Sequence, residues 1–529
     1  MAAARDEADG DQFALTHLLR WLAGEARVRT ADGGRETADR GPRSGARGAG
    51  GVRAPAAPFP TVTMSSLPDG QPPLRPGGLF VAVRGRRDGH DFAADALAHG
   101  ARAALVARVP DDLQAEVQAG RLAVYDFRSP AQREAFVSGQ APGSAGALLL
   151  VDDPLAAIQA CAAWWRRRQP ARVLAVTGSV GKTTAKELLA NTLARRYRVL
   201  RTEGNLNNEL GLPFMLLRLT PAHERAVLEI GISAVGEMAA FAAIAAPDVA
   251  IVTRVAPAHL EQFGDLATVE REKGALVEAL PPEGLAILNA DDPRVARMAQ
   301  RTAARIVSYG ESAHADVRAT EVEALGFDGL GFRLHRGGRS ERVRVPLVGR
   351  HFVAAALAAA AAAFEEGCPW DAVVAGLAQP PATGRLRPRR LANGATVLDD
   401  AYNASPAAVM AALDVLAAGR GRRVAVLGDM LELGAAGAAA HRDVGRYVPG
   451  RADELVAVGD LAGHIAAGAR EAGLAPDRAH VFAGNAAALA FLRARLAAGD
   501  SVLVKGSRSA HMDEIVRGLT DEPESGGAH

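Results

Sequence analysis

A strand, a glycine-bounded turn and a helix follow one another in the stretch RVLAVTGSVGKTTAKELLANTLARR, residues 172–196. The apolar run before Gly178 predicts a buried strand, and the residues from Lys182 onward predict a helix. This order gathers backbone N–H groups of the turn at the amino end of the helix, where the helix dipole also attracts an anion. The stretch therefore indicates an α/β fold and predicts a phosphate site.

The turn is typical of proteins that bind a nucleoside triphosphate. Lys182 can reach the β- and γ-phosphates, and the hydroxyl of Thr183 can coordinate Mg²⁺. Val176 stands where the common GxxxxGK[ST] motif has its first glycine, so the turn is a shorter relative of that motif. An ordinary strand-to-helix turn is the alternative, but a GKTT that follows an apolar strand and opens a helix favours phosphate binding.

Apolar runs alternate with helical stretches along most of the chain. LFVAVRG and ARAALVA precede the turn, RAVLEIG, DVAIVT and GLAILNA follow it, and the alternation restarts after 381–388 with ATVLDDA, RRVAVLGD, ELVAVGD, HVFAG and SVLVKGS. Such alternation predicts parallel sheets covered on both faces. We predict three α/β domains: an N-terminal substrate domain over 1–146, a central P-loop NTPase-like sheet over 147–380, and a C-terminal Rossmann-like domain over 381–529.

Several segments stand outside this alternation. Residues 14–25 have apolar side chains at helical spacing, and the Gly-, Arg- and Pro-rich residues 31–60 predict a flexible insertion. Residues 110–144 show weak periodicity and suggest an elaboration. The Ala-rich run 353–364 is too short to cross a bilayer and predicts a buried helix.

Composition excludes several classes of protein. The net charge of +1 gives no basis for binding nucleic acid or an anionic membrane. Cys161 and Cys368 are far apart and lack a CxxC pairing, which favours buried thiols over a disulfide or zinc site. The polar start MAAARDEADGDQ does not resemble a signal peptide. We expect a cytoplasmic monomer without membrane insertion.

Lysine is used sparingly in this chain. Only four of the 61 Lys and Arg residues are lysine, and they are Lys182, Lys186, Lys273 and Lys505. Lysine has a compact ammonium group that can lose its proton, whereas the guanidinium of arginine is planar and stays charged. Because this chain uses arginine for nearly all of its other positive charges, the four lysines are candidates for a chemical role. A helix-surface charge remains an equal alternative for Lys186.

Two further polar residues follow strands of the central region. Glu229 ends RAVLEIG, and His259 follows DVAIVT. Ligands of parallel sheets bind beyond the carboxyl ends of the strands, so a carboxylate and an imidazole there predict a second divalent ion beside the one at Thr183.

The motifs TGSVGKTTAKE, EGNLNNELGLP, AHLEQFG, LNADDP, GRLRP, DDAYNASP, GDMLELG and VLVKGSRS occur in an order that resembles the Mur ligases. The likeness covers roughly residues 75–108 and 147–520. NLNNELGLP, GDMLELG and KGSR are most similar to the members that add D-alanyl-D-alanine.

The resemblance implies a role for each matching residue. Residues expected at the ATP phosphates are Gly178, Ser179, Val180, Gly181, Lys182, Thr183 and Thr184. Metal ligands would be Thr183 for one Mg²⁺, and Glu229, His259 and a CO₂-carbamylated Lys273 for a second. Asn289, Asp292, Asp400 and Tyr402 would lie by the nucleotide, with Arg385 at the γ-phosphate. Asn207 and Asn208 would contact the muramoyl peptide, and Lys505, Ser507 and Arg508 would lie towards D-alanyl-D-alanine.

The implied reaction joins UDP-N-acetylmuramoyl-tripeptide to D-alanyl-D-alanine through an acyl phosphate, with ATP as the energy source. It would complete the cytoplasmic peptidoglycan precursor UDP-MurNAc-pentapeptide. The catalytic set would be Lys182, Glu229, His259, Lys273 and Arg385.

Three places depart from the family pattern. Met64-Ser65-Ser66 replaces Asp-Ser-Arg in the uridine region, Phe352 and Ala355 replace two asparagines expected near adenine, and Arg254 stands where asparagine is usual. These departures keep two alternatives open: a related ATP-dependent amino-acid ligase of the same fold, and a nucleotide-binding homologue that has lost catalysis.

Overall fold

The computed structural model describes residues 78–129 without 86, 146–256, 260–381, 386–431 and 433–520, with short pieces at 18, 21–22 and 62–63. The predicted flexible insertion at 31–60 lies outside the described residues. Leu18, Trp21 and Leu22 are helical, in agreement with the helix expected at 14–25. Two compact units can be distinguished, one of residues 1–175 and 198–248 and one of residues 176–197 and 249–528.

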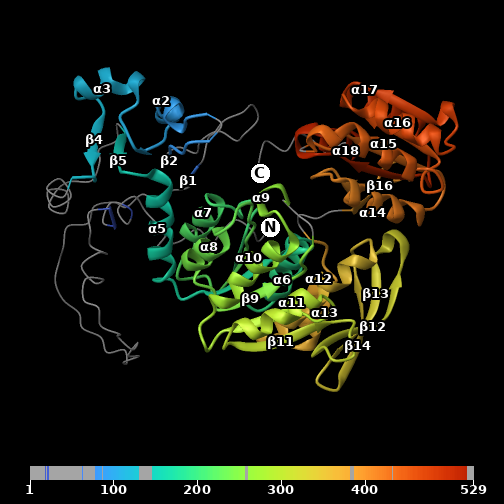
Figure 1. The fold of residues 1–529 in the computed structure, drawn as a ribbon, viewed down its shortest axis with the longest axis horizontal. Coiled ribbons are helices and arrows are strands. Elements are labelled where there is room, and N and C mark those ends of the chain that lie inside the picture. Colours follow the sequence, from blue (N-terminus) through green and yellow to red (C-terminus); the bar gives the residue numbers. More distant parts are fainter. Residues whose placement is uncertain are drawn as a thin grey trace. The chain divides into compact units, whose positions relative to one another are not determined.

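The N-terminal sheet has five strands in the order β1-β2-β3-β5-β4 (Figure 1), and their pairings are parallel. The strands are β1 (Val62–Thr63), β2 (Leu79–Val81), β3 (Ala103–Val106), β4 (Ala123–Asp126) and β5 (Ala147–Leu150). Helices α2 (Ala93–Ala98) and α3 (Gln114–Gln118) belong with them.

This sheet corrects two details of the sequence interpretation. The weakly periodic residues after 110 contain a regular helix and strand, α3 and β4. Strand β5, which we placed at the start of the central domain, pairs instead with β3 and β4, and its buried residues Leu148 and Leu150 belong to the N-terminal core. The change of sheet therefore comes after β5, at helix α5 (Pro154–Arg166).

The central sheet has nine strands in the order β14-β13-β12-β11-β10-β9-β6-β8-β7. Its strands are β6 (Arg172–Thr177), β7 (Val199–Arg201), β8 (Arg225–Glu229), β9 (Val249–Val252), β10 (Leu285–Asn289), β11 (Arg305–Gly310), β12 (Val317–Ala324), β13 (Leu330–Arg336) and β14 (Arg339–Val345). Strands β12 to β14 pair antiparallel and were not predicted.

Residues 178–181, between β6 and the next helix, form the turn for which we predict phosphate binding, and we call them the phosphate turn. Helix α6 (Lys182–Leu193) follows this turn and packs against α12 (Val353–Glu365) and α13 (Trp370–Leu377). Helix α12 is the Ala-rich run, and all of its alanines except Ala354 are buried, in agreement with the predicted buried helix. Other helices of the region are α7 (Gly211–Leu217), α8 (Glu237–Ala245), α9 (Leu260–Phe263), α10 (Leu266–Glu278) and α11 (Pro293–Arg297). Cys161 and Cys368 are buried free thiols, also as predicted.

The C-terminal sheet has six strands in the order β15-β16-β20-β17-β18-β19, and only β15 is antiparallel to its neighbour. They are β15 (Arg387–Arg390), β16 (Thr396–Asp400), β17 (Arg423–Gly428), β18 (Glu454–Val458), β19 (Ala479–Phe482) and β20 (Ser501–Lys505). The helices are α14 (Pro406–Ala417), α15 (Gly437–Tyr447), α16 (Ala462–Glu471), α17 (Asn485–Arg495) and α18 (Asp513–Thr520).

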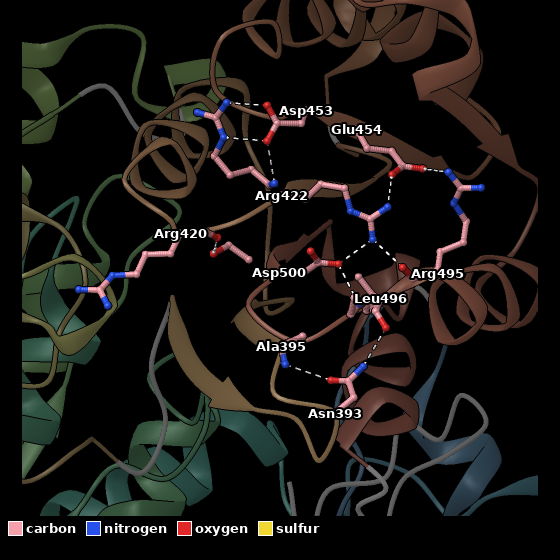
Figure 2. Close-up of polar contacts among 12 residues, drawn as sticks. Asn393, Ala395, Arg420, Arg422, Asp453, Glu454, Arg495, Leu496 and Asp500 are labelled. Carbon is pink, nitrogen blue, oxygen red and sulfur yellow. Dashed lines mark hydrogen bonds and ion pairs between the residues drawn. The ribbon is translucent and has the colours of Figure 1, made fainter.

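Charged side chains gather where the strands of this sheet begin (Figure 2). Arg422, just before β17, donates to Glu454 Oε2 at 3.0 Å and to Asp500 Oδ2 at 2.6 Å, and also to the carbonyl of Arg495 at 2.6 Å. Arg495 in turn pairs with Glu454 Oε1 at 3.2 Å. We call Arg422, Glu454, Arg495 and Asp500 the amino-end cluster.

None of the helices in the described part of the chain is both long and apolar enough to cross a membrane.

Candidate nucleotide and substrate site

The phosphate turn follows β6 and ends at α6, as the sequence predicts. Gly178 has φ +143° and Gly181 has φ +89°, a backbone conformation that favours glycine. A Cβ at Gly178 would lie 2.0 Å from Oγ1 of Thr253. Both glycines are therefore required by the path of the backbone.

Residues 253–256, which follow β9, brace this turn from the side. Oγ1 of Thr253 donates to the carbonyl of Val180 at 2.7 Å. The Ser179 N–H donates to the Arg254 carbonyl at 2.6 Å, and its hydroxyl donates to the Ala256 carbonyl at 2.8 Å. The turn is thus held before any phosphate binds. The Arg254 brace uses its backbone, so the side chain that departs from the family pattern leaves it intact.

Lys182 begins α6, and its Nζ donates to the carbonyl of Gly178 at 2.7 Å, across the mouth of the turn. Lys273 lies on α10 and is 4% exposed. Burial, and after it the positive charge of Lys182, lowers the pKa of Lys273 to about 7. A large fraction of this amine is therefore neutral at physiological pH, as carbamylation requires.

Asn289 and Asp292 lie behind the brace. Asn289 Nδ2 donates to the carbonyl of Thr253 at 2.8 Å, and Asp292 Oδ2 accepts the Val255 N–H at 2.8 Å. Asp292 also caps α11 through its other oxygen. Asn289 and Asp292 were expected to lie near the adenosine. In the structure they position residues 253–256, which in turn brace the phosphate turn.

Glu229 ends β8 and is 3% exposed. Its Oε1 accepts from Asn207 Nδ2 at 2.8 Å, and its backbone N–H donates to Thr202 Oγ1 at 2.9 Å. Asn208 accepts the N–H of Gly211, the first residue of α7, at 2.9 Å. Asn207 is thus joined to a predicted metal ligand, while Asn208 supports a helix start.

Four predicted residues, Asp400, Tyr402, Lys505 and Arg508, lie at or just beyond the carboxyl ends of β16 and β20. Lys505 is fully buried, and its Nζ donates to Asp400 Oδ2 at 2.6 Å and to the carbonyl of Asn403 at 2.8 Å. Tyr402 is 46% exposed, and the guanidinium carbon of Arg508 lies 5.4 Å from its ring centre. Lys505 therefore faces the protein interior, and Tyr402 and Arg508 face outward.

Ser507 connects the turn after β20 to the turn after β17. Its hydroxyl accepts the N–H of Leu431 at 2.8 Å, and its own N–H donates to the carbonyl of Asp429 at 2.9 Å. His441, fully buried, accepts the N–H of Met430 at 2.9 Å. Asp429 also accepts the N–H of Asp460 at 2.9 Å and the N–H of Leu461 at 3.1 Å. Five hydrogen bonds from other elements therefore fix residues 429–431.

His259 and Arg385 lie outside the described residues, so their predicted roles stay predictions. Among the residues that the structure describes, no three His, Cys, Asp or Glu side chains are grouped to hold a metal. Sequence reasoning missed Thr253, Asp429 and His441. A threonine directly after a buried strand was the available signal for Thr253; His441 offered none, since its partner is set by the fold.

Comparison with known proteins agrees with this architecture. Residues 176–363 match the family model described as Mur ligase middle domain, and residues 384–508 match the one described as Mur ligase, glutamate ligase domain. UDP-N-acetylmuramoyl-tripeptide–D-alanyl-D-alanine ligase from Escherichia coli is 38% identical over 87% of this chain and 94% of its own length. The ligase of that name from Bacillus subtilis is 31% identical, over 84% and 91%.

Solved structures give the same result. A crystal structure of MurF from Acinetobacter baumannii aligns with a TM-score of 0.71 and 33% identity, covering 85% of this chain and 92% of that one. MurF from Thermotoga maritima in complex with ADP aligns with a TM-score of 0.65 and 25% identity, covering 85% and 95%. The chain therefore belongs to the Mur ligase family.

Proposed function

We propose that this chain is an ATP-dependent ligase that joins D-alanyl-D-alanine to UDP-N-acetylmuramoyl-tripeptide in peptidoglycan precursor synthesis, in the cytoplasm. The observation that carries the proposal is the phosphate turn, which residues 253–256 hold in place and beside which Lys182 begins helix α6. A turn held in this way at a helix amino end is preorganised for the phosphates of a triphosphate. The relatives named above, which this chain covers over more than nine-tenths of their length, support the substrates.

The residues of the site suit each step of the reaction. When ATP binds, the ammonium group of Lys182 gives up its hydrogen bond to the Gly178 carbonyl and binds the phosphates instead. Its charge then neutralises the charge that develops as the tripeptide carboxylate attacks the γ-phosphorus. ADP leaves and an acyl phosphate remains. The amine of D-alanyl-D-alanine forms an N–C bond with its carbonyl carbon and gives up one proton, the C–O bond to the phosphate breaks, and an amide and inorganic phosphate, which takes up that proton, remain. No nucleophile of the protein is needed, so positioning and exclusion of water supply the rate.

The donor atoms present fit magnesium. The hydroxyl of Thr183 and the buried carboxylate of Glu229 are oxygen ligands of the type Mg²⁺ prefers. With His259, they are the proposed ligands of two ions, which would neutralise the phosphate oxygens. The neutral amine of Lys273 would form an N–C bond with CO₂, release one proton and supply carbamate oxygens to the second site.

Phosphate release tests the proposal directly. The protein is incubated with ATP, Mg²⁺ and UDP-N-acetylmuramoyl-tripeptide, and a panel of single amino acids and dipeptides is added in turn. We expect release only with D-alanyl-D-alanine, together with a pentapeptide product. Release driven by a single amino acid would instead assign the chain to another ligase of this fold. Nucleotide binding without any release would identify a homologue that has lost catalysis.

A further inference from the structure

Lys505 was expected to lie towards the incoming dipeptide, but its surroundings give it another task. It ends β20, is fully buried, and has Asp400 as its register neighbour at the end of β16. Asp400 is itself only 3% exposed. The ammonium group is thus committed to a carboxylate inside the domain, where a ligand from solvent does not reach it.

The second contact of Lys505 reaches into the loop between β16 and α14. Its Nζ donates to the carbonyl of Asn403 at 2.8 Å, and Asn403 in turn accepts the N–H of Ala404 at 2.9 Å through Oδ1. One ammonium group therefore ties the end of two strands to the middle of residues 401–405. Tyr402, Asn403 and Ser405 are the exposed members of that loop, and Tyr402 is the one with an aromatic ring.

The pair has no obvious value as a source of stability. Burying two charges costs solvation free energy that their attraction often only offsets, so such pairs are weak evidence for stabilisation. The chain also uses lysine here although arginine supplies most of its positive charge. A compact ammonium can donate to Asp400 and to a backbone carbonyl at once in a fully buried position, where a planar guanidinium needs more room.

Resting on the function proposed above, we propose that Lys505 and Asp400 are positioning residues that fix residues 401–404. We call the contacts of Lys505 with Asp400 and the Asn403 carbonyl the clamp. The ring of Tyr402 lies under the guanidinium of Arg508, so by fixing Tyr402 the clamp also positions Arg508, the exposed cation of the turn KGSR. The free carboxylate of D-alanyl-D-alanine needs a cation, and the charge of Lys505 is already taken by Asp400. Loss of the clamp should therefore weaken dipeptide binding without removing any group that touches the dipeptide.

Three variants separate positioning from direct contact. Lys505→Met leaves Asp400 buried without its cation, and we expect KM for D-alanyl-D-alanine to rise about tenfold or more, with a smaller change in kcat and in KM for ATP. The double variant Lys505→Met/Asp400→Asn has no lone buried charge, but it also lacks the ammonium group that holds the Asn403 carbonyl, so we expect its KM for the dipeptide to stay raised even where its stability recovers. Arg422→Met, in the amino-end cluster of the same sheet, is the matched control and should leave KM unchanged in the folded enzyme.

Hydrogen exchange supplies a readout that does not depend on activity. Amides of 401–405 should exchange faster in Lys505→Met than in the unmodified chain, and faster in the double variant as well, because both lack the bond to the Asn403 carbonyl. Arg422→Met should not change them selectively. If Lys505→Met fails to fold, the double variant alone decides: its loss of dipeptide affinity with unchanged exchange at 401–405 would mean that Lys505 contacts the dipeptide.

Two outcomes would overturn the inference: a double variant that binds the dipeptide as tightly as the unmodified chain, or exchange at 401–405 that neither variant changes. If the unmodified chain releases no phosphate in response to D-alanyl-D-alanine, the proposed function fails. The exchange measurement would still decide whether the clamp exists.

Discussion

The buried lysines and the amino-end cluster place charge inside the protein in two different ways. Lys273 and Lys505 are 4% and 0% exposed, and each lies in the region where we expect substrates. The guanidinium side chain of Arg422 is 27% exposed and joins two carboxylates and a carbonyl where the strands begin. Ligands of parallel sheets bind at the carboxyl ends of the strands, so we expect lysine changes to alter activity and changes in the cluster to alter stability.

The largest expected effect is at Lys273. Lys273→Met should lower kcat by about 100-fold or more, the usual size when one preorganised electrostatic group is removed. Short carboxylates such as acetate should restore part of the rate if the lysine is carbamylated. Steady-state phosphate release measures both, and a fully active variant without added carboxylate would refute the carbamate.

The same variant should become more stable. Burial lowers the pKa of Lys273 from 10.5 to about 7, so below pH 7 the buried ammonium group lowers the free energy of unfolding. This destabilisation disappears as pH rises from 7 towards 10.5, because the folded state then holds the neutral amine. Lys273→Met should thus gain on the order of 1–4 kcal/mol at pH 6 and less at pH 9. Thermal unfolding in CO₂-free buffer without Mg²⁺ tests this, and a gain that grows with pH would contradict it.

Arg422→Met should lower the stability of the protein and leave its activity unchanged, the reverse of what we expect for Lys273→Met. Glu454 and Asp500 would lose their shared cation, and the free energy of unfolding should fall by about 2–3 kcal/mol, less than for a fully buried pair because the guanidinium is partly exposed. kcat per folded molecule should not change. Arg420→Met is the control, since this side chain is exposed and points away from the cluster (Figure 2), and it should cost no more than about 0.5 kcal/mol.

The smallest effect is expected beside the cluster, at Asp453. Hydrogen bonds from Arg423 lower the pKa of this carboxyl group, so its stabilisation is present above the unfolded pKa of about 3.9 and is lost as pH falls through the lower folded pKa. Asp453→Asn should cost at most about 1 kcal/mol at pH 7, because the pair is partly exposed and screened. The cost should shrink below pH 4; an equal cost at pH 3 would exclude this charge effect.

The sequence predicted the parallel strands well because buried strands are continuous apolar runs, such as RVLAVT and SVLVKGS. It did not predict the antiparallel strands β12 to β14, which bury one face only and are interrupted by charged residues. Gly337 and Gly338, with φ of +55° and +79°, form the two-residue hairpin turn between β13 and β14, and this Gly-Gly pair was the missed signal.

The candidate site was predictable in its residue types but not in its hydrogen bonding. The glycine-bounded turn after an apolar strand identified Lys182, and the position at a strand end identified Glu229, whereas Asp400 came only from the family resemblance. Whether such a residue faces ligand or protein depends on partners distant in sequence. Lys505 meets Asp400, 105 residues earlier, and Asn289 meets Thr253, 36 residues earlier. Periodicity does not report such contacts, because only the tertiary fold creates them.

Strand β14 forms one edge of the nine-stranded sheet, and a long edge strand is a template on which a second molecule can add a strand. Val343 and Val345 are buried, while three of the four exposed positions of β14 are arginines, Arg339, Arg342 and Arg344, and the fourth is Ser340. A second copy aligned on this edge would bring like charges together and bury them. The arginines that this chain favours over lysine thus also discourage its own aggregation.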